Sequence, residues 1–250
     1  MAFQAAQTHT EDNKPFRKQY RLFHATFAQF CYTGAQVAIA GFFINYVTES
    51  RPNTDNPLGA RFLAGAQGAF AIGRFVGTFL MKFVRPRWVF LVFMTCCIIF
   101  ISPSIAHGGN AGMAMLFLTL FFESIIFPTI VALGMRGLGR HTKRGSGYIV
   151  AGVAGGAVVP PLLGVAADNF DSTQKAMCVP LAFFITAWSY ALCVNFVPTY
   201  RDVADRFSTT EIGVANNAGG DLEKTGESVK REERVGEIEE TAREERLESK

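Results

Sequence analysis

The sequence has little of what metal-dependent or covalent chemistry requires. It contains five cysteines and four histidines among 250 residues, and these do not follow the spacing of a metal-ligand cluster. It also lacks a phosphate-cradling glycine loop and a nucleophile paired with a base. The cysteines fall inside apolar segments, where we expect them to act as small fillers between helices. The sequence therefore predicts a protein that is not an enzyme and holds no metal or cofactor.

Charged residues are scarce between residues 21 and 197. Six apolar segments there are each long enough to span a bilayer, which takes about 20 residues at roughly 1.5 Å of rise per residue. Their ranges are 22–47, 58–84, 88–106, 111–133, 147–167 and 176–197. The second segment contains Arg61 and Arg74, with Lys82 near its end, and the fourth contains Glu123. This pattern predicts an all-α membrane protein whose residues 21–197 form a six-transmembrane-helix bundle.

Basic residues alternate between the two ends of the predicted spans. One side carries Lys14, Arg17, Lys18, Arg21, Lys82, Arg85, Arg87, Arg136, Arg140, Lys143, Arg144, Arg201 and Arg206. The other side carries only Arg51, Arg61 and Lys175. Because basic loops stay on the cytoplasmic side, we expect both termini to be cytoplasmic, with an N-terminal tail over residues 1–20.

The two ends of the chain differ in charge. Residues 198–250 hold 14 acidic and 9 basic residues, whereas residues 1–197 hold 7 acidic and 15 basic ones. A polar, charge-rich segment buries too little apolar surface to fold, so we expect residues 198–250 to be a disordered cytoplasmic tail. The basic excess belongs to the loops and tail of a membrane domain, which predicts a lipid bilayer as partner and no nucleic acid.

The first span carries a stripe of polar side chains. Gln29, Tyr32, Thr33 and Gln36 lie within roughly 100° of one another when residues advance by about 100° each. Amides and an aromatic hydroxyl suit the hydroxyl groups and C–H faces of a sugar. The alternative is that these side chains only bond to neighbouring helices.

Two charged residues of opposite sign lie deep in the predicted bundle. A charge at the bilayer centre costs about 2.5–3.5 kcal/mol on insertion scales, so Arg74 and Glu123 should each face a partner or a wet cavity. We expect them to form either a structural ion pair or a gate that responds to protonation. Prolines should also bend two spans, at Pro128 and at the pair Pro160 and Pro161.

Several stretches resemble the C-terminal half of the fucose permease family of sugar–proton symporters, which belongs to the major facilitator superfamily; fungal hexose transporters share the pattern. The resemblance is carried by residues 29–36 (QFCYTGAQ), 73–78 (GRFVGT), 127–130 (FPTI), 137–146 (GLGRHTKRGS) and 155–164 (GGAVVPPLLG). Members of this family have two six-helix halves with a sugar bound between them. The first and fourth helices of each half line that cavity. The resemblance thus implies sugar-facing roles for Gln29, Tyr32, Gln36, Glu123 and Phe127.

The resemblance further implies transport of a monosaccharide of the fucose, glucose and galactose class, coupled to protons and working by alternating access. It implies a second six-helix half as partner and a plasma-membrane location in preference to an internal one. The sequence departs from the family because no N-terminal half is present in the 250 residues. The alternative function is therefore a truncated, non-transporting membrane scaffold or remnant.

Overall fold

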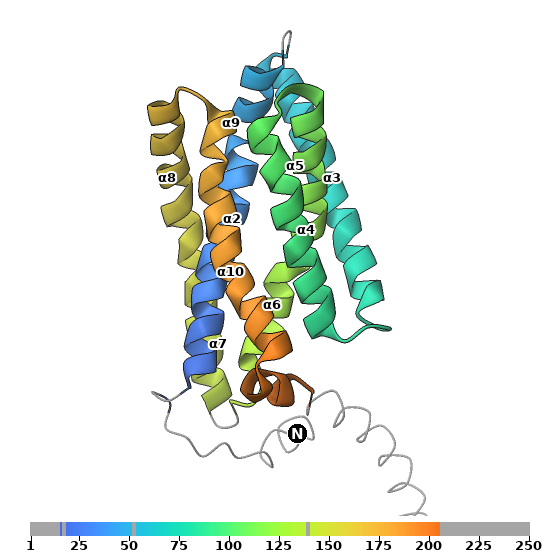
Figure 1. Cartoon of the computed structure of the whole chain (residues 1–250), viewed down its shortest axis with the longest axis vertical. Coiled ribbons are helices and arrows are strands. Elements are labelled where there is room, and N and C mark those ends of the chain that lie inside the picture. Colours follow the sequence, from blue (N-terminus) through green and yellow to red (C-terminus); the bar gives the residue numbers. More distant parts are fainter. Residues whose placement is uncertain (1–15, 17–18, 52–53, 139–140, 206–250) are drawn as a thin grey trace, which may run out of the picture. The chain divides into compact units, whose positions relative to one another are not determined.

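A computed structural model describes residues 16, 19–51, 54–138 and 141–205, and all regular structure in these ranges is helical. Over the described residues, six spans are long and apolar enough to cross a membrane, which confirms the predicted all-α bundle. Most spans are longer than the apolar segments from which they were predicted. The predicted tails lie largely outside the described residues, but residues 198–205 are helical. Figure 1 shows the helices α2 Tyr20–Ser50, α3 Asn56–Leu80, α4 Pro86–Ala106, α5 Gly109–Glu123, α6 Ile126–Met135, α7 Thr142–Ala151, α8 Gly155–Phe170, α9 Thr173–Ala176 and α10 Cys178–Phe196.

Three of the spans are interrupted, and in the sixth the residue Met177 separates α9 from α10. The fourth span divides into α5 and α6 at Ser124 and Ile125. This break lies three and four residues before Pro128, where a proline ring displaces the backbone and removes a hydrogen bond. In the fifth span, a 3₁₀ turn at Gly152–Ala154 separates α7 from α8. Pro160 and Pro161 lie inside α8, and the predicted bend at these two prolines stays a prediction.

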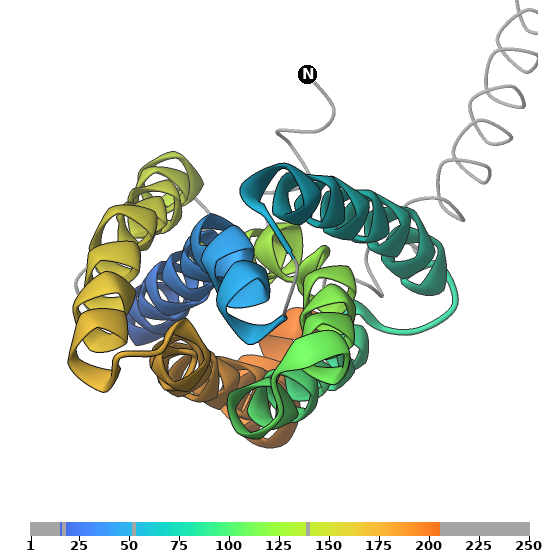
Figure 2. The same cartoon turned by 90° about the horizontal axis from the view of Figure 1, so that it is seen from above.

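Helix α2 occupies the centre of the bundle. It packs against α8, α10, α6, α3, α7 and α5, and Figure 2 shows it, in blue, with α8 on one side and α10 on another. Its side chains Tyr32, Ile39, Phe43 and Tyr46 are fully buried. The first span thus supplies the surface on which the second, fourth, fifth and sixth spans assemble.

The contact between α2 and α8 depends on glycines. A Cβ at Gly155 of α8 would overlap the backbone carbonyl of Phe30, and a Cβ at Gly34 of α2 would overlap Val159. Helices in lipid associate through close packing because apolar surface gains nothing by leaving lipid. These two glycines let the backbones approach and so fix the position of α8 against α2.

Tyr32 supports the chain at the break in the fourth span. Its hydroxyl donates a hydrogen bond of 2.5 Å to the backbone carbonyl of Glu123, the last residue of α5. Carbonyls at a helix end lack a partner within the helix, and lipid offers none. Tyr32 supplies that partner from α2, while its ring stacks on Phe184 of α10 at 6.2 Å between centroids.

Helices α3 and α8 are the least covered. In the most apolar part of each span, 17% of α3 and 28% of the α7–α8 span are buried, compared with 56% of α2. The exposed side chains on α3 include Phe75 and Phe79, and those on α8 include Leu162 and Val165. Both helices therefore offer wide apolar faces for lipid or for another protein.

We expect Gly155→Ala to destabilise the bundle by about 1–3 kcal/mol, because overpacking a close helix contact forces the backbones apart. Thermal unfolding of the purified chain in detergent, followed by circular dichroism, measures the effect. Gly147→Ala is the matched control, since a Cβ at this position in α7 meets no atom within 4 Å. Equal unfolding midpoints for the two variants would contradict the assigned contact.

Tyr32→Phe should lower the free energy of unfolding by about 1–3 kcal/mol, because it leaves the Glu123 carbonyl buried without a donor. Tyr148→Phe removes the same atom from a ring that is 48% exposed. Its hydroxyl makes no hydrogen bond within the described part of the chain, so this variant should unfold like the parent. The same unfolding assay compares the two, and a Tyr32→Phe variant as stable as Tyr148→Phe argues against the Tyr32 hydrogen bond.

Candidate functional site

The polar stripe of α2 turns mostly inward. Gln29 and Tyr32 are fully buried and Thr33 is nearly so, whereas Gln36 is half-buried. The Gln29 amide Nε2 donates to the Thr33 hydroxyl at 3.3 Å, and its side chain lies against Gly152. Of the predicted sugar-facing residues on α2, the structure therefore leaves Gln36 partly open and encloses Gln29 and Tyr32 between helices.

Glu123 and Phe127 occupy different environments on the broken fourth span. Glu123 is 1% exposed and lies behind Tyr32 at the end of α5, whereas Phe127 is half-buried on α6. In the conformation described, the Glu123 carboxyl cannot contact a sugar on the bundle surface. Its predicted contact with sugar would need a rearrangement at the break between α5 and α6.

Arg74 does not pair with Glu123. Among the described residues no ion pair joins the two side chains, and the Arg74 guanidinium lies over the Phe70 ring at 5.0 Å from its centroid. The reason is the orientation of α3 about its own axis, which decides which of its residues face α5. Gly73 faces α5, because a Cβ there would overlap the Phe121 carbonyl, and the next residue is turned away by about 100°. Arg74 therefore lies beside the face of α3 that packs on α5, and it is exposed.

An exposed polar face follows α3. Gln67, Arg74 and Thr78 are all exposed, and at about 100° per residue they share one side of the helix. Gln67 lies near the midpoint of α3 (Asn56–Leu80), as Gln36 lies near the midpoint of α2 (Tyr20–Ser50). Polar groups at mid-membrane depth are expensive in lipid, so such residues face protein or a water-filled cavity. Gln36 and Gln67 are thus the amides placed to meet a polar molecule.

The exposed face of α4 is different. Val92 and Ile99 are 52% and 57% exposed and both are apolar, as expected for a surface that meets acyl chains. The contrast between α3 and α4 separates a candidate wet side of the bundle from a lipid side.

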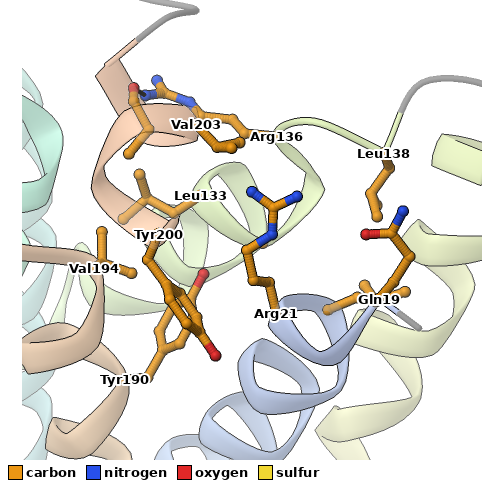
Figure 3. Close-up of a pocket in the computed structure, with 12 residues that line it drawn as sticks. Gln19, Arg21, Leu133, Arg136, Leu138, Tyr190, Val194, Tyr200 and Val203 are labelled. Atoms are coloured by element: carbon orange, nitrogen blue, oxygen red, sulfur yellow. Dashed lines mark hydrogen bonds between the residues drawn. The ribbon is translucent and has the colours of Figure 1, made fainter. Parts of the chain in front are cut away.

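A small cavity lies at the end of the bundle where α2 begins (Figure 3). Its volume is about 20 Å³, which is room for a water molecule but not for a sugar. Tyr190 of α10 and Tyr200 of the following helix line it together with Gln19, Arg21 and Arg136. This cavity is therefore too small for the predicted sugar.

Side chains beside this cavity attach residues 198–204 to the bundle. Arg21 Nη1 donates to the Thr199 carbonyl at 3.3 Å, and Arg136 Nη1 donates to the Ala204 carbonyl at 2.6 Å. The His24 ring nitrogens lie 3.3 Å from the Tyr200 hydroxyl and 3.1 Å from the Ser189 hydroxyl. Burial raises the pKa of the Tyr200 hydroxyl.

From the sequence, Arg21 and Arg136 indicated only the orientation of the spans. A guanidinium that donates to a distant carbonyl leaves no pattern in the sequence, so these contacts could not have been found there.

Comparison with known proteins relates this bundle to sugar transporters, although no protein family model matches the chain. The L-fucose-proton symporter of Escherichia coli K12 is 37% identical over 171 residues, which cover 67% of this chain and 38% of that protein. A putative glucose/galactose transporter of Helicobacter pylori J99 is 34% identical over 65% of this chain and 41% of its own length. A glucose/galactose transporter of Brucella abortus is 32% identical, with 65% and 38% covered.

Solved structures agree with the sequence relatives. The crystal structure of the E. coli fucose:proton symporter superposes with a TM-score of 0.68 at 33% identity and covers 71% of this chain and 45% of that one. A second structure, of a major facilitator superfamily transporter in the outward conformation, gives a TM-score of 0.68 at 32% identity, with 74% and 47% covered. The chain spans about two-fifths of the length of the curated relatives it matches. The chain therefore has the six-helix fold of part of a major facilitator superfamily transporter, and its relatives are fucose and glucose/galactose transporters.

Proposed function

We propose that this bundle is the C-terminal half of a transporter that moves a monosaccharide of the fucose, glucose and galactose class across a membrane. Transport would be coupled to protons and proceed by alternating access of two halves around a midplane site. The relatives support the substrate class, since their names include fucose-proton symporter and glucose/galactose transporter. The family resemblance of residues 155–164 and 137–146 favours the C-terminal half.

The observation that carries this proposal is that Gln67 is exposed and Gln36 only half-buried near the midpoints of their helices. An amide without a hydrogen-bond partner in an apolar medium costs roughly 2–7 kcal/mol, depending on the reference state. A scaffold that faces lipid all round would carry apolar side chains there, as α4 does at Ile99. A transport pathway instead needs amides that can both donate to and accept from sugar hydroxyls.

A second six-helix half is the partner that fits this bundle best. The apolar side chains on α3 and α8, with Phe75 79% exposed and Val165 59% exposed, flank the polar positions of α2 and α3. A partner packed on α3 and α8 would bury these faces and leave Gln36 and Gln67 on the wall of an enclosed cavity. The half described here supplies one wall of that cavity.

The proposed orientation puts both termini in the cytoplasm of a plasma-membrane protein. Arg21 and Arg136 lie at the end of the bundle where α2 begins, as the positive-inside rule requires of the cytoplasmic side. In that orientation the helix of residues 198–205 lies at the cytoplasmic face.

Membrane vesicles from cells that express the chain together with a second six-helix half should take up labelled fucose, glucose or galactose faster than vesicles from cells that express that second half alone. A proton gradient directed inward should stimulate that uptake. Gln67→Leu should reduce uptake several-fold because it removes a hydrogen-bonding group from the pathway, whereas Ile99→Val on the lipid side should not. Uptake equal to that of control vesicles would favour the alternative, a non-transporting scaffold.

The wet face is testable separately by chemical labelling. In the same vesicles, Gln36→Cys and Gln67→Cys should react with a membrane-impermeant maleimide, and transported sugar should slow the reaction. Ile99→Cys should remain unlabelled, because maleimides require the thiolate and lipid excludes water. The parent chain, with its five native cysteines, supplies the background. Labelling no faster at residues 36 and 67 than at residue 99 would contradict a water-filled pathway.

A further inference from the structure

The carboxyl of Glu123 is enclosed by the bundle and makes no ion pair among the described residues. The residue is 1% exposed, and its Oε2 atom is buried with no hydrogen-bond partner in the described part of the chain. The nearby Tyr32 hydroxyl donates to the backbone carbonyl of Glu123 and not to its side chain. A buried polar atom that is left unpaired in this way calls for a chemical explanation.

Among the groups around this carboxyl, Arg74 of α3 is a cation whose charge acts on the Tyr32 hydroxyl, but within the described part of the chain it makes no ion pair with Glu123. Tyr32 of α2 and Cys97 of α4 are the titratable side chains whose charges would interact with it. The Cys97 thiol is directed to the Thr119 carbonyl at 3.8 Å. Arg74 of α3 lies on the exposed side of that helix over Phe70. Helix α10 contributes Phe184, an uncharged side chain whose ring stacks on Tyr32.

Electrostatics then decides between the two forms of the carboxyl. An isolated carboxylate in an apolar interior loses its hydration and gains no partner, and such groups neutralise instead. A protonated carboxyl is neutral, and one of its oxygens becomes a donor. The neutral form is the one that this environment tolerates.

We propose that Glu123 is a proton-binding site inside the bundle, and that it holds its proton in the conformation described here. The proposal rests on the enclosure of Glu123 among α2, α4 and α5, and it stands whether or not the chain transports sugar. Glu123 is the last residue of α5, beside the break at Ser124 and Ile125. A rearrangement of α6 against α5 is therefore the movement that would admit water and release the proton.

Infrared spectroscopy of the full chain in lipid vesicles tests this directly. The carbonyl band of a protonated carboxylic acid should be present at neutral pH, where solvent-exposed Asp and Glu side chains are ionised. Glu123→Gln, which keeps the size of the side chain, should abolish the band. Glu123→Asp, which keeps the acid, should shift it. Circular dichroism establishes that each variant remains helical.

Glu49→Gln is the matched control. The Glu49 carboxylate accepts hydrogen bonds from the Thr173 amide at 2.7 Å and hydroxyl at 2.6 Å, so its removal should leave the band unchanged. Absence of the band from the parent chain at neutral pH would overturn the proposal. So would a band that neither Glu123 variant changes.

Discussion

Lipid offers no hydrogen-bond partners, and this constraint governs where every polar group of the bundle can lie. Inside the bundle, several polar side chains find partners on neighbouring helices: the Tyr32 hydroxyl donates to the Glu123 carbonyl, the Tyr46 hydroxyl to the Ser104 carbonyl, and the Trp188 indole to the Thr95 hydroxyl. On the surface of α4 the exposed side chains of Val92 and Ile99 are apolar, and the exposed hydroxyl of Ser102 donates to the Ile98 carbonyl of its own helix. The half-buried amide of Gln36 and the exposed amide of Gln67 fit neither pattern, and this exception favours the proposed transport pathway over a scaffold.

The central position of α2 links packing to function. Through Gly34 it allows α8 to approach closely, and through Tyr32 it supports the break between α5 and α6. The same helix carries Gln36 toward the open side of the bundle. A movement at the α5–α6 break would therefore change the contacts of α2, which carries Gln36. It would also change the surroundings of Glu123.

Hydropathy alone predicted the six spans, because a segment that crosses lipid must be apolar over its whole length. Residue spacing was less informative about the site. The 100° period placed Gln29, Tyr32 and Gln36 on one stripe, but the neighbours that bury Gln29 and Tyr32 come from helices far away in the sequence. Opposite charge suggested pairing of Arg74 with Glu123, but the rotation of α3 is set by Gly73 against α5. Contacts to backbone carbonyls, such as those of Arg21 and Arg136, have no sequence signature.

The most direct measurement is a high-resolution map of the chain in a lipid nanodisc, together with any membrane partner that purifies with it. It would show what lies within hydrogen-bond distance of the Gln36 and Gln67 amides. If these residues line a transport pathway, the map will show ordered water, a bound sugar or polar groups of a second six-helix unit at both amides. Acyl chains packed against both amides would contradict it.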